Sequence, residues 1–152
     1  MSLRDQITEI IEDKLCRITE DKRDANRRFY FKNYEDNLIR RMCCDHIVEY
    51  GGGSGGEMTA KGNRPAKMAS IASSSAMTFN ILGNLSVDIK PGYGFVPGSY
   101  SVKYEKQMYT LNKGSNLANL DAFLYNLDEQ EALFCEMKML EWFGKPGVLK
   151  AA

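Results

Sequence analysis

The sequence predicts an α+β fold in which helices come first and a mainly antiparallel β-meander follows. In the first half of the chain, apolar residues recur at helical spacing between charged residues. In the second half, three short segments either alternate polar with apolar residues or form brief apolar runs bounded by turn residues. The chain has 152 residues, of which 43% are hydrophobic, so a core of ordinary size can form.

Three helices are predicted, over residues 3–18, 34–48 and 66–82. The glycine-rich run 51–56 ends the second helix region, because such a run has high backbone entropy and does not sit inside a regular element. Gly83 supplies the stop for the third helix. All three patterns place charged or small residues between the apolar positions, which is typical of helices that pack on one face.

Three strands are predicted after the helices, over residues 100–111, 120–125 and 132–140. Turn-forming Asn, Gly, Ser and Asp residues separate them, which favours an antiparallel arrangement. The third helix is expected to pack on this three-stranded meander. We therefore expect residues 1–50 to form an N-terminal helical arm or cap and residues 51–152 to form the core.

Three charged side chains interrupt the last two predicted strands. Strand alternation places Glu136 and Lys138 on the same face, and Asp121 is the odd residue in the short apolar strand before them. An antiparallel turn can bring Asp121 beside Glu136, and two neighbouring carboxylates repel unless a cation or a proton joins them. The pattern indicates a divalent-cation site; a structural salt-bridge cluster on the solvent face of the sheet is the alternative.

The order of Asp121, a short hairpin and then Glu136-Met137-Lys138 resembles the signature of the PD-(D/E)XK nuclease superfamily. Four phrases are also similar, in order, to a little-characterised group of bacterial restriction endonucleases: Gly55 to Met58, Lys67 to Ala76, Asn119 to Phe123 and Cys135 to Lys138. The resemblance implies a restriction-endonuclease-like α/β core, in which Asp121 and Glu136 ligate Mg²⁺ or Mn²⁺ and Lys138 is the catalytic lysine. It also implies hydrolysis of DNA phosphodiester bonds in restriction-type defence.

The chain departs from the family pattern in three places. The helix over residues 66–82 has no acid, so Glu57, just ahead of it, is the candidate for the further acid that many superfamily members supply; an ordinary exposed carboxylate is the alternative. Leu120 stands where the name-giving proline would be. Only residues 142–152 follow the Glu-x-Lys strand, so we expect a truncated nuclease, a fragment or half of an assembly such as a homodimer. The alternative function is accordingly a non-catalytic nuclease-fold interaction or dimerisation module.

Other motifs favour simpler interpretations. Cys43, Cys44 and His46 lack a second zinc-ligand pair, so we expect buried, reduced thiols, while a Cys/His nucleophile pair stays open. The glycine run follows a helix and has Glu57 where a phosphate-binding loop needs lysine, so no organic cofactor is expected. A small-molecule site that uses this glycine loop would need a deep apolar pocket away from the three charged residues.

Charge and hydropathy bound the partners and the location. The formal net charge is zero, which argues against binding nucleic acid through bulk charge alone but allows acids at a centre with a basic rim. No apolar run long enough for a membrane span is present and the start of the chain is charged, so we expect a cytoplasmic protein. Several basic residues could contact a nucleic-acid backbone: Arg27, Arg28, Arg40, Arg41, Lys61, Arg64 and Lys67. The alternative is that these residues lie on solvated helix faces.

Overall fold

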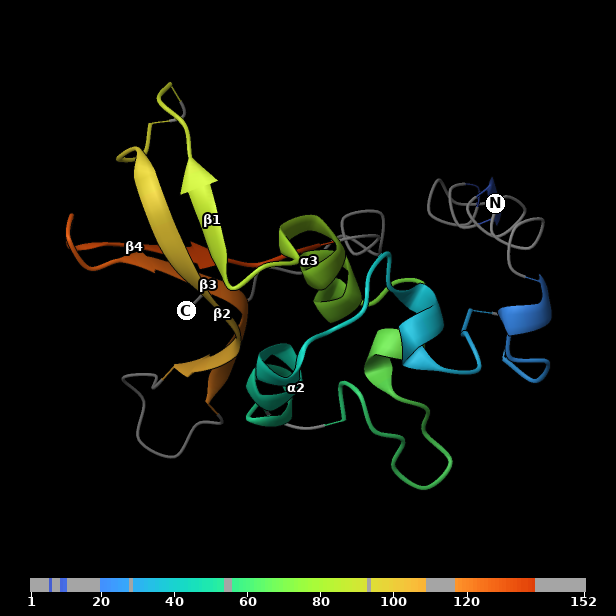
Figure 1. Ribbon diagram of the computed structural model, residues 1–152. Helices are drawn as coiled ribbons and strands as arrows, with labels where there is room; N and C mark the ends of the chain where they lie inside the picture. The colour runs from blue at the N-terminus through green and yellow to red at the C-terminus, as the bar shows by residue number, and fades with distance from the viewer. Residues whose placement is uncertain are drawn as a thin grey trace, which may run out of the picture.

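The computed structural model describes residues 6, 9–10, 20–27, 29–53, 56–92, 94–108 and 117–138. Within these ranges, two α-helices precede a four-stranded antiparallel sheet of order β1-β2-β3-β4 (Figure 1). The fold is therefore α+β, as predicted. The elements are η1 (Glu20–Lys22), η2 (Tyr34–Asn37), α2 (Cys44–Gly51), η3 (Lys67–Ala69), α3 (Ser74–Leu82), β1 (Ser86–Ile89), β2 (Gly98–Met108), β3 (Ala118–Asn126) and β4 (Glu131–Cys135).

The helices are shorter than predicted because local caps set their starts. In the third predicted helix, only η3 and α3 are helical; Ser73 is the N-cap of α3, and its Oγ accepts a hydrogen bond from Ala76 N at 3.2 Å. Gly83, with φ of 56°, ends α3 in the left-handed conformation, as expected for a glycine C-cap. The predicted helix 34–48 is likewise reduced to η2 and α2.

Part of the first prediction cannot be compared. The predicted helix 3–18 lies outside the described residues, apart from residues 6, 9 and 10, which are helical. The division of the chain near residue 50 stays a prediction.

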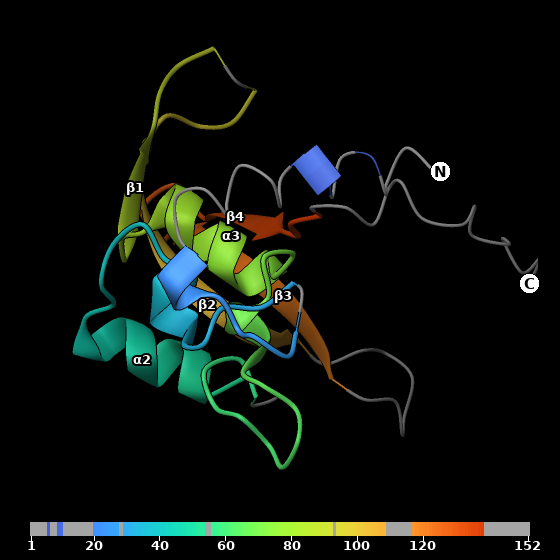
Figure 2. The same ribbon diagram turned by 90° about the vertical axis from the view of Figure 1, so that its right-hand side faces the viewer.

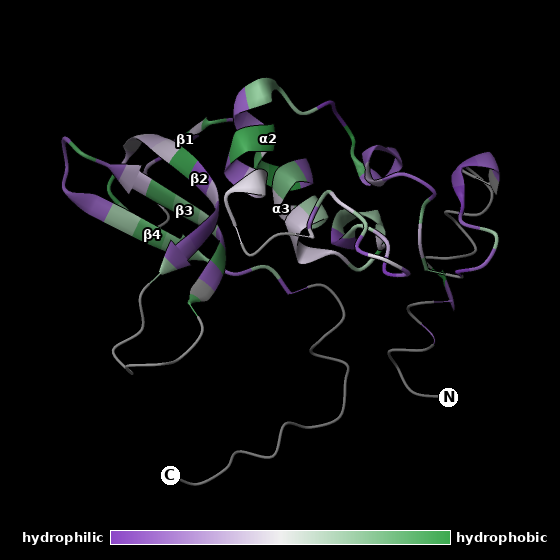
Figure 3. Ribbon diagram, turned by 90° about the horizontal axis from the view of Figure 1, so that it is seen from below, coloured by the Kyte–Doolittle hydropathy of each residue, from purple (hydrophilic) through white to green (hydrophobic). Residues whose placement is uncertain are grey.

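The sheet contains the three predicted strands and one more. β1 was not predicted, and it pairs antiparallel with β2. β4 ends at Cys135, so the prediction that Glu136 and Lys138 lie within the last strand is wrong: they follow it. Residues 139–140 of that predicted strand lie outside the described residues. Figure 3 shows hydrophilic and hydrophobic residues alternating along the strands, the pattern on which the strand prediction rests.

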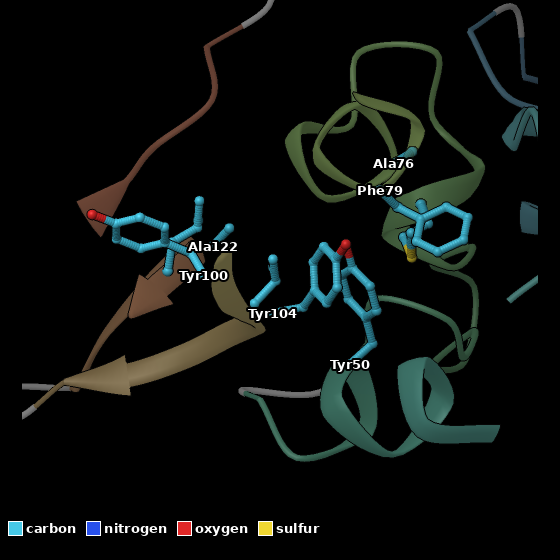
Figure 4. Close-up of a cluster of buried hydrophobic side chains, with 9 residues drawn as sticks. Tyr50, Ala76, Phe79, Tyr100, Tyr104 and Ala122 are labelled. Atoms are coloured by element: carbon cyan, nitrogen blue, oxygen red, sulfur yellow. The ribbon is translucent and has the colours of Figure 1, made fainter. Parts of the chain in front are cut away.

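The core lies between one face of the sheet and the two α-helices, which Figures 1 and 2 both show on the same side. Tyr50 of α2 stacks on Tyr104 of β2, with ring centroids 5.0 Å apart, and Phe79 of α3 meets both rings (Figure 4). All three side chains are at most 1% exposed. An ion pair from Lys103 to Glu49, at 2.6 Å, further ties β2 to α2. No helix in the described ranges is long and apolar enough to span a membrane.

Phe79→Ala tests this core. We expect the free energy of unfolding to fall by about 3–5 kcal/mol, because the substitution leaves a cavity among buried rings. Urea unfolding followed by circular dichroism measures the change. The control is Ile81→Ala in the same helix, whose side chain is exposed and whose loss should cost less than about 1 kcal/mol. Equal losses for both variants would contradict the described packing.

Candidate active site

Glu57 is held at the base of a surface loop by its own backbone. The carbonyls of Gly56 and Glu57 accept hydrogen bonds from Lys67 N and Met68 N, both at 2.9 Å, which fixes the segment against η3. The side chain is buried, at 4% exposure, so the alternative of an ordinary exposed carboxylate is wrong. The ammonium of Lys67 pairs with Oε1 of Glu57, and the hydroxyl of Ser75 lies 2.8 Å from Oε2.

Glu105 brings a second carboxylate to the same serine. Its neighbours Tyr104 and Lys106 pair with Ala122 and Leu120, so the ladder sets Glu105 opposite Asp121. The backbone of Glu105 has a φ of 49°, a conformation that costs free energy in a non-glycine residue and interrupts the regular pleat. The side chain is buried, and Oε1 lies 2.6 Å from the Ser75 hydroxyl.

The Ser75 hydroxyl cannot satisfy two ionised carboxylates. A hydroxyl has one hydrogen to donate, whereas an ionised carboxylate only accepts, so one of the two contacts requires a protonated carboxyl group. Burial raises the pKa of Glu105 to about 7; Glu57 and Asp121 add to the rise, which the Ser75 hydrogen bond opposes. We therefore assign the proton to Glu105 when it bridges to Ser75.

Asp121 of β3 supplies the third buried carboxylate. Its Oδ2 accepts a hydrogen bond from Met137 N at 2.7 Å. Asp121 therefore binds the backbone of the middle residue of Glu136-Met137-Lys138. Burial raises the pKa of Asp121, and Glu136 contributes further; hydrogen bonds from Met137 and Ser74 and the charge of Lys138 act in the opposite direction. Asp121 thus lies within electrostatic reach of both predicted partners.

The Tyr50 phenol lies within electrostatic reach of the three buried acids. The Tyr50 hydroxyl donates to the Ser75 carbonyl at 3.1 Å. Its pKa is raised first by burial and then by Tyr104, Glu105, Asp121 and Glu57. One group therefore senses all three carboxylates. Lys67 pairs with Glu57, while Lys138, whose charge also acts on Asp121, pairs with Glu136. The three acids therefore repel one another unless a proton or a cation joins them.

Glu136 and Lys138 stand at the outer edge of this cluster. Both are exposed, and the Lys138 ammonium pairs with Oε1 of Glu136. This pair fits the salt-bridge alternative, and its influence on the pKa of Asp121 fits the predicted convergence. The site therefore has two parts. We call Glu57, Glu105 and Asp121 the buried acid cluster, and Glu136 with Lys138 the Glu-Lys pair.

The oxygen atoms of the buried acid cluster are of the type that binds a hard divalent cation. Carboxylate and hydroxyl oxygens are what Mg²⁺ and Mn²⁺ prefer, and no thiol or imidazole contacts the buried acid cluster in the described ranges. In the arrangement described, no three acidic, histidine or cysteine side chains come close enough to hold one ion together. Ser75 and the Met137 amide occupy the carboxylate oxygens instead, so coordination by Asp121 and Glu57 would replace these hydrogen bonds.

The cysteine prediction needs a correction. Cys43 and Cys44 are exposed, not buried, although both are free thiols as expected; Cys16 lies outside the described residues. His46 Nδ1 lies 2.9 Å from Cys43 Sγ and accepts from Cys43 N at 3.2 Å. The two residues form the capping box of α2, which gives the pair a structural role.

No known protein family, curated protein or solved structure matches the chain. The assignment of the site therefore rests on its geometry. Sequence reasoning found Glu57, Asp121, Glu136 and Lys138 but missed Glu105. The sequence pattern gives Glu105 no distinction among the polar residues of its strand, and its burial coincides with a left-handed backbone, φ 49°, that the pattern does not reveal.

The raised pKa of Glu105 predicts how stability changes with pH. In the unfolded chain a glutamate ionises near its ordinary value of about 4.3. The folded chain therefore binds more protons between that pH and about 7, and the free energy of unfolding falls as pH rises through this window. The raised pKa of Asp121 acts in the same direction.

Glu105→Gln should flatten this pH dependence by on the order of 3 kcal/mol, because glutamine keeps the hydrogen bonding but does not ionise. Urea unfolding at a series of pH values, with a chelator present, measures it. Glu129→Gln, at an exposed turn position, is the control and should leave the profile unchanged. A Glu105→Gln profile as steep as that of the parent would show that Glu105 is ionised in the folded chain.

Proposed function

We propose that the protein is a metal-dependent endonuclease with a restriction-endonuclease-like core that hydrolyses DNA phosphodiester bonds. One observation carries the proposal: three buried carboxylates act electrostatically on one another, Lys67 pairs with one of them, and the exposed Glu-Lys pair acts on another. Such an excess of buried negative charge is costly unless it is neutralised, and a divalent cation would neutralise it. The resemblance of Asp121, Glu136 and Lys138 to the PD-(D/E)XK residue pattern is further support.

Each residue has a distinct part in the proposed reaction. Asp121, with Glu136 and Glu57, would hold Mg²⁺ or Mn²⁺, which when bound polarises the scissile phosphate and lowers the pKa of water. In hydrolysis, the water oxygen bonds to phosphorus, and the bond to one ester oxygen breaks. The Lys138 ammonium is exposed and pairs with Glu136; in the proposed reaction it would contact the phosphate and stabilise the developing negative charge.

Glu105 would contribute through its proton. With a pKa of about 7, it can keep a hydrogen bond to Ser75 in the protonated form, or ionise when a cation enters the cluster. Tyr50 and Phe79 would form the rigid wall behind the cluster, since both are buried and packed against Tyr104. This wall would keep the acids in place and exclude water from one side.

A second candidate function is a non-catalytic interaction or dimerisation module. The observation that favours it is an aromatic group on β3 and β4: Phe123 contacts Tyr125 and Phe134, and Phe134 is 60% exposed. Such a surface is typical of a contact with another chain. This module would bind no divalent ion, so the response to metal separates the two functions.

Cleavage of supercoiled plasmid DNA with Mg²⁺ or Mn²⁺ tests the nuclease proposal. We expect the parent to nick or cut the plasmid, and Asp121→Asn and Lys138→Ala to lower the rate by about 100-fold or more, because each removes a charge acting on the phosphate or the cation. Lys90→Ala, at an exposed position at the end of β1, is the control and should cut at the parent rate.

Thermal unfolding with and without Mn²⁺ separates binding from chemistry. The parent should gain stability as Mn²⁺ is added, and Asp121→Asn should not, since a ligand that binds only the folded state stabilises it. A parent that neither cuts DNA nor responds to Mn²⁺ would leave the interaction module as the better account.

A further inference from the structure

A basic loop lies beside the buried acid cluster. We define it as residues 58–66; it leaves from Glu57 and returns at Lys67. Its tip is a short turn closed by paired backbone hydrogen bonds between Lys61 and Arg64, at 2.9 and 3.0 Å. In Figures 1 and 2 this green loop projects from the body of the molecule. A projecting loop with a fixed tip can contact a large partner without rearrangement of the core.

The charges of the basic loop are of one sign. It contains Lys61 and Arg64 but no acid, and both residues are exposed. Neither forms an ion pair with any described residue. Arg27 adds a third cation at the tip, where its guanidinium donates to the Asn63 carbonyl and lies 3.8 Å from Asp24. Arg28, its neighbour, lies outside the described residues.

Lys61 of the basic loop lies close to the buried acid Glu57. The side chains of Lys61 and Lys67 both run past Gly56, the residue before Glu57. The Cε atom of each lysine is 3.8 Å from the position that a Cβ atom on Gly56 would take. Lys67 pairs with Glu57, while Lys61 remains without an acidic partner among the described residues. A phosphate bound by Lys61 would therefore lie next to Glu57.

The surface beside the loop is concave. A depression of about 570 Å³ runs between the loop and residues 24–35, and Arg27, Lys32 and Arg64 line it together with Asp24 and Glu35. Asp24 is paired with Arg27, so three cations and two acids leave this surface with a single net positive charge, and Lys61 adds to it at the tip of the loop. The shape and the charge fit an extended polyanion better than a small ligand.

We infer that the basic loop binds the phosphate backbone of duplex DNA and delivers the strand to the buried acid cluster. The inference rests on the proposed function for its choice of DNA. Lys61 and Arg64 each contact one phosphate, which adds affinity but no sequence preference, because phosphates carry no base information. The loop is thus a positioning surface for the substrate.

The salt dependence of DNA binding tests this inference. Each phosphate contact in duplex DNA lowers log K by about 0.9 per unit of log salt concentration, so Lys61→Gln/Arg64→Gln should reduce the slope by about 1.8. Each single substitution should reduce it by about 0.9. Fluorescence anisotropy of a labelled DNA duplex over a salt series measures the slope, with a chelator present so that no strand is cut.

Lys90→Gln removes the same charge far from the loop, at the end of β1, and should leave the slope unchanged. The inference is overturned if the parent does not bind DNA at low salt, if the double variant keeps the parent slope, or if Lys90→Gln lowers the slope as much as a loop substitution. Circular dichroism shows whether the variants fold. A parent that binds through the loop but does not cut DNA with Mg²⁺ would contradict the nuclease proposal and leave this inference standing.

Discussion

The burial of three carboxylates, two of which contact the hydroxyl of one serine, is the constraint on which the proposed site depends. Glu57 comes from the loop before η3, Glu105 from β2 and Asp121 from β3, and Ser75 of α3 joins the first two. Ionised carboxylates within electrostatic reach of one another repel in a poorly solvated interior, and Lys67 pairs with only one of the three. The cluster must therefore take up a proton or a cation. Its charge then depends on the pH or on the cation concentration of the solution.

The aromatic core explains why this costly arrangement persists. Tyr50, Phe79 and Tyr104 lock α2 and α3 against the sheet, and the Tyr50 hydroxyl reaches the Ser75 carbonyl inside the cluster. The burial of these rings contributes several kcal/mol, of the same order as the cost of one partly compensated buried charge. On the other side, Lys67 connects Glu57 to the basic loop, so a single residue links the core-facing acids to the surface that would meet a polyanion.

Sequence patterns predicted much of this arrangement, and local backbone chemistry accounts for what they missed. Alternation predicted three strands because each has one face on the core. The helix starts were wrong because the Ser73 cap, which periodicity does not reveal, begins α3 well after Pro65. Asp121 stood out as one acid in an apolar strand. Glu105 did not, since it is one of several polar residues in an alternating strand, and neither its burial nor its positive φ can be read from that alternation.

The location of Mn²⁺ in crystals of the protein, read from anomalous scattering, is the most direct test of the central claim. The account predicts an ion bonded to the carboxylates of Asp121, Glu136 and Glu57, with the contacts of Asp121 to Met137 and of Glu57 to Ser75 displaced. Crystals saturated with Mn²⁺ in which these hydrogen bonds are intact, and in which the ion lies only at surface carboxylates, would contradict it.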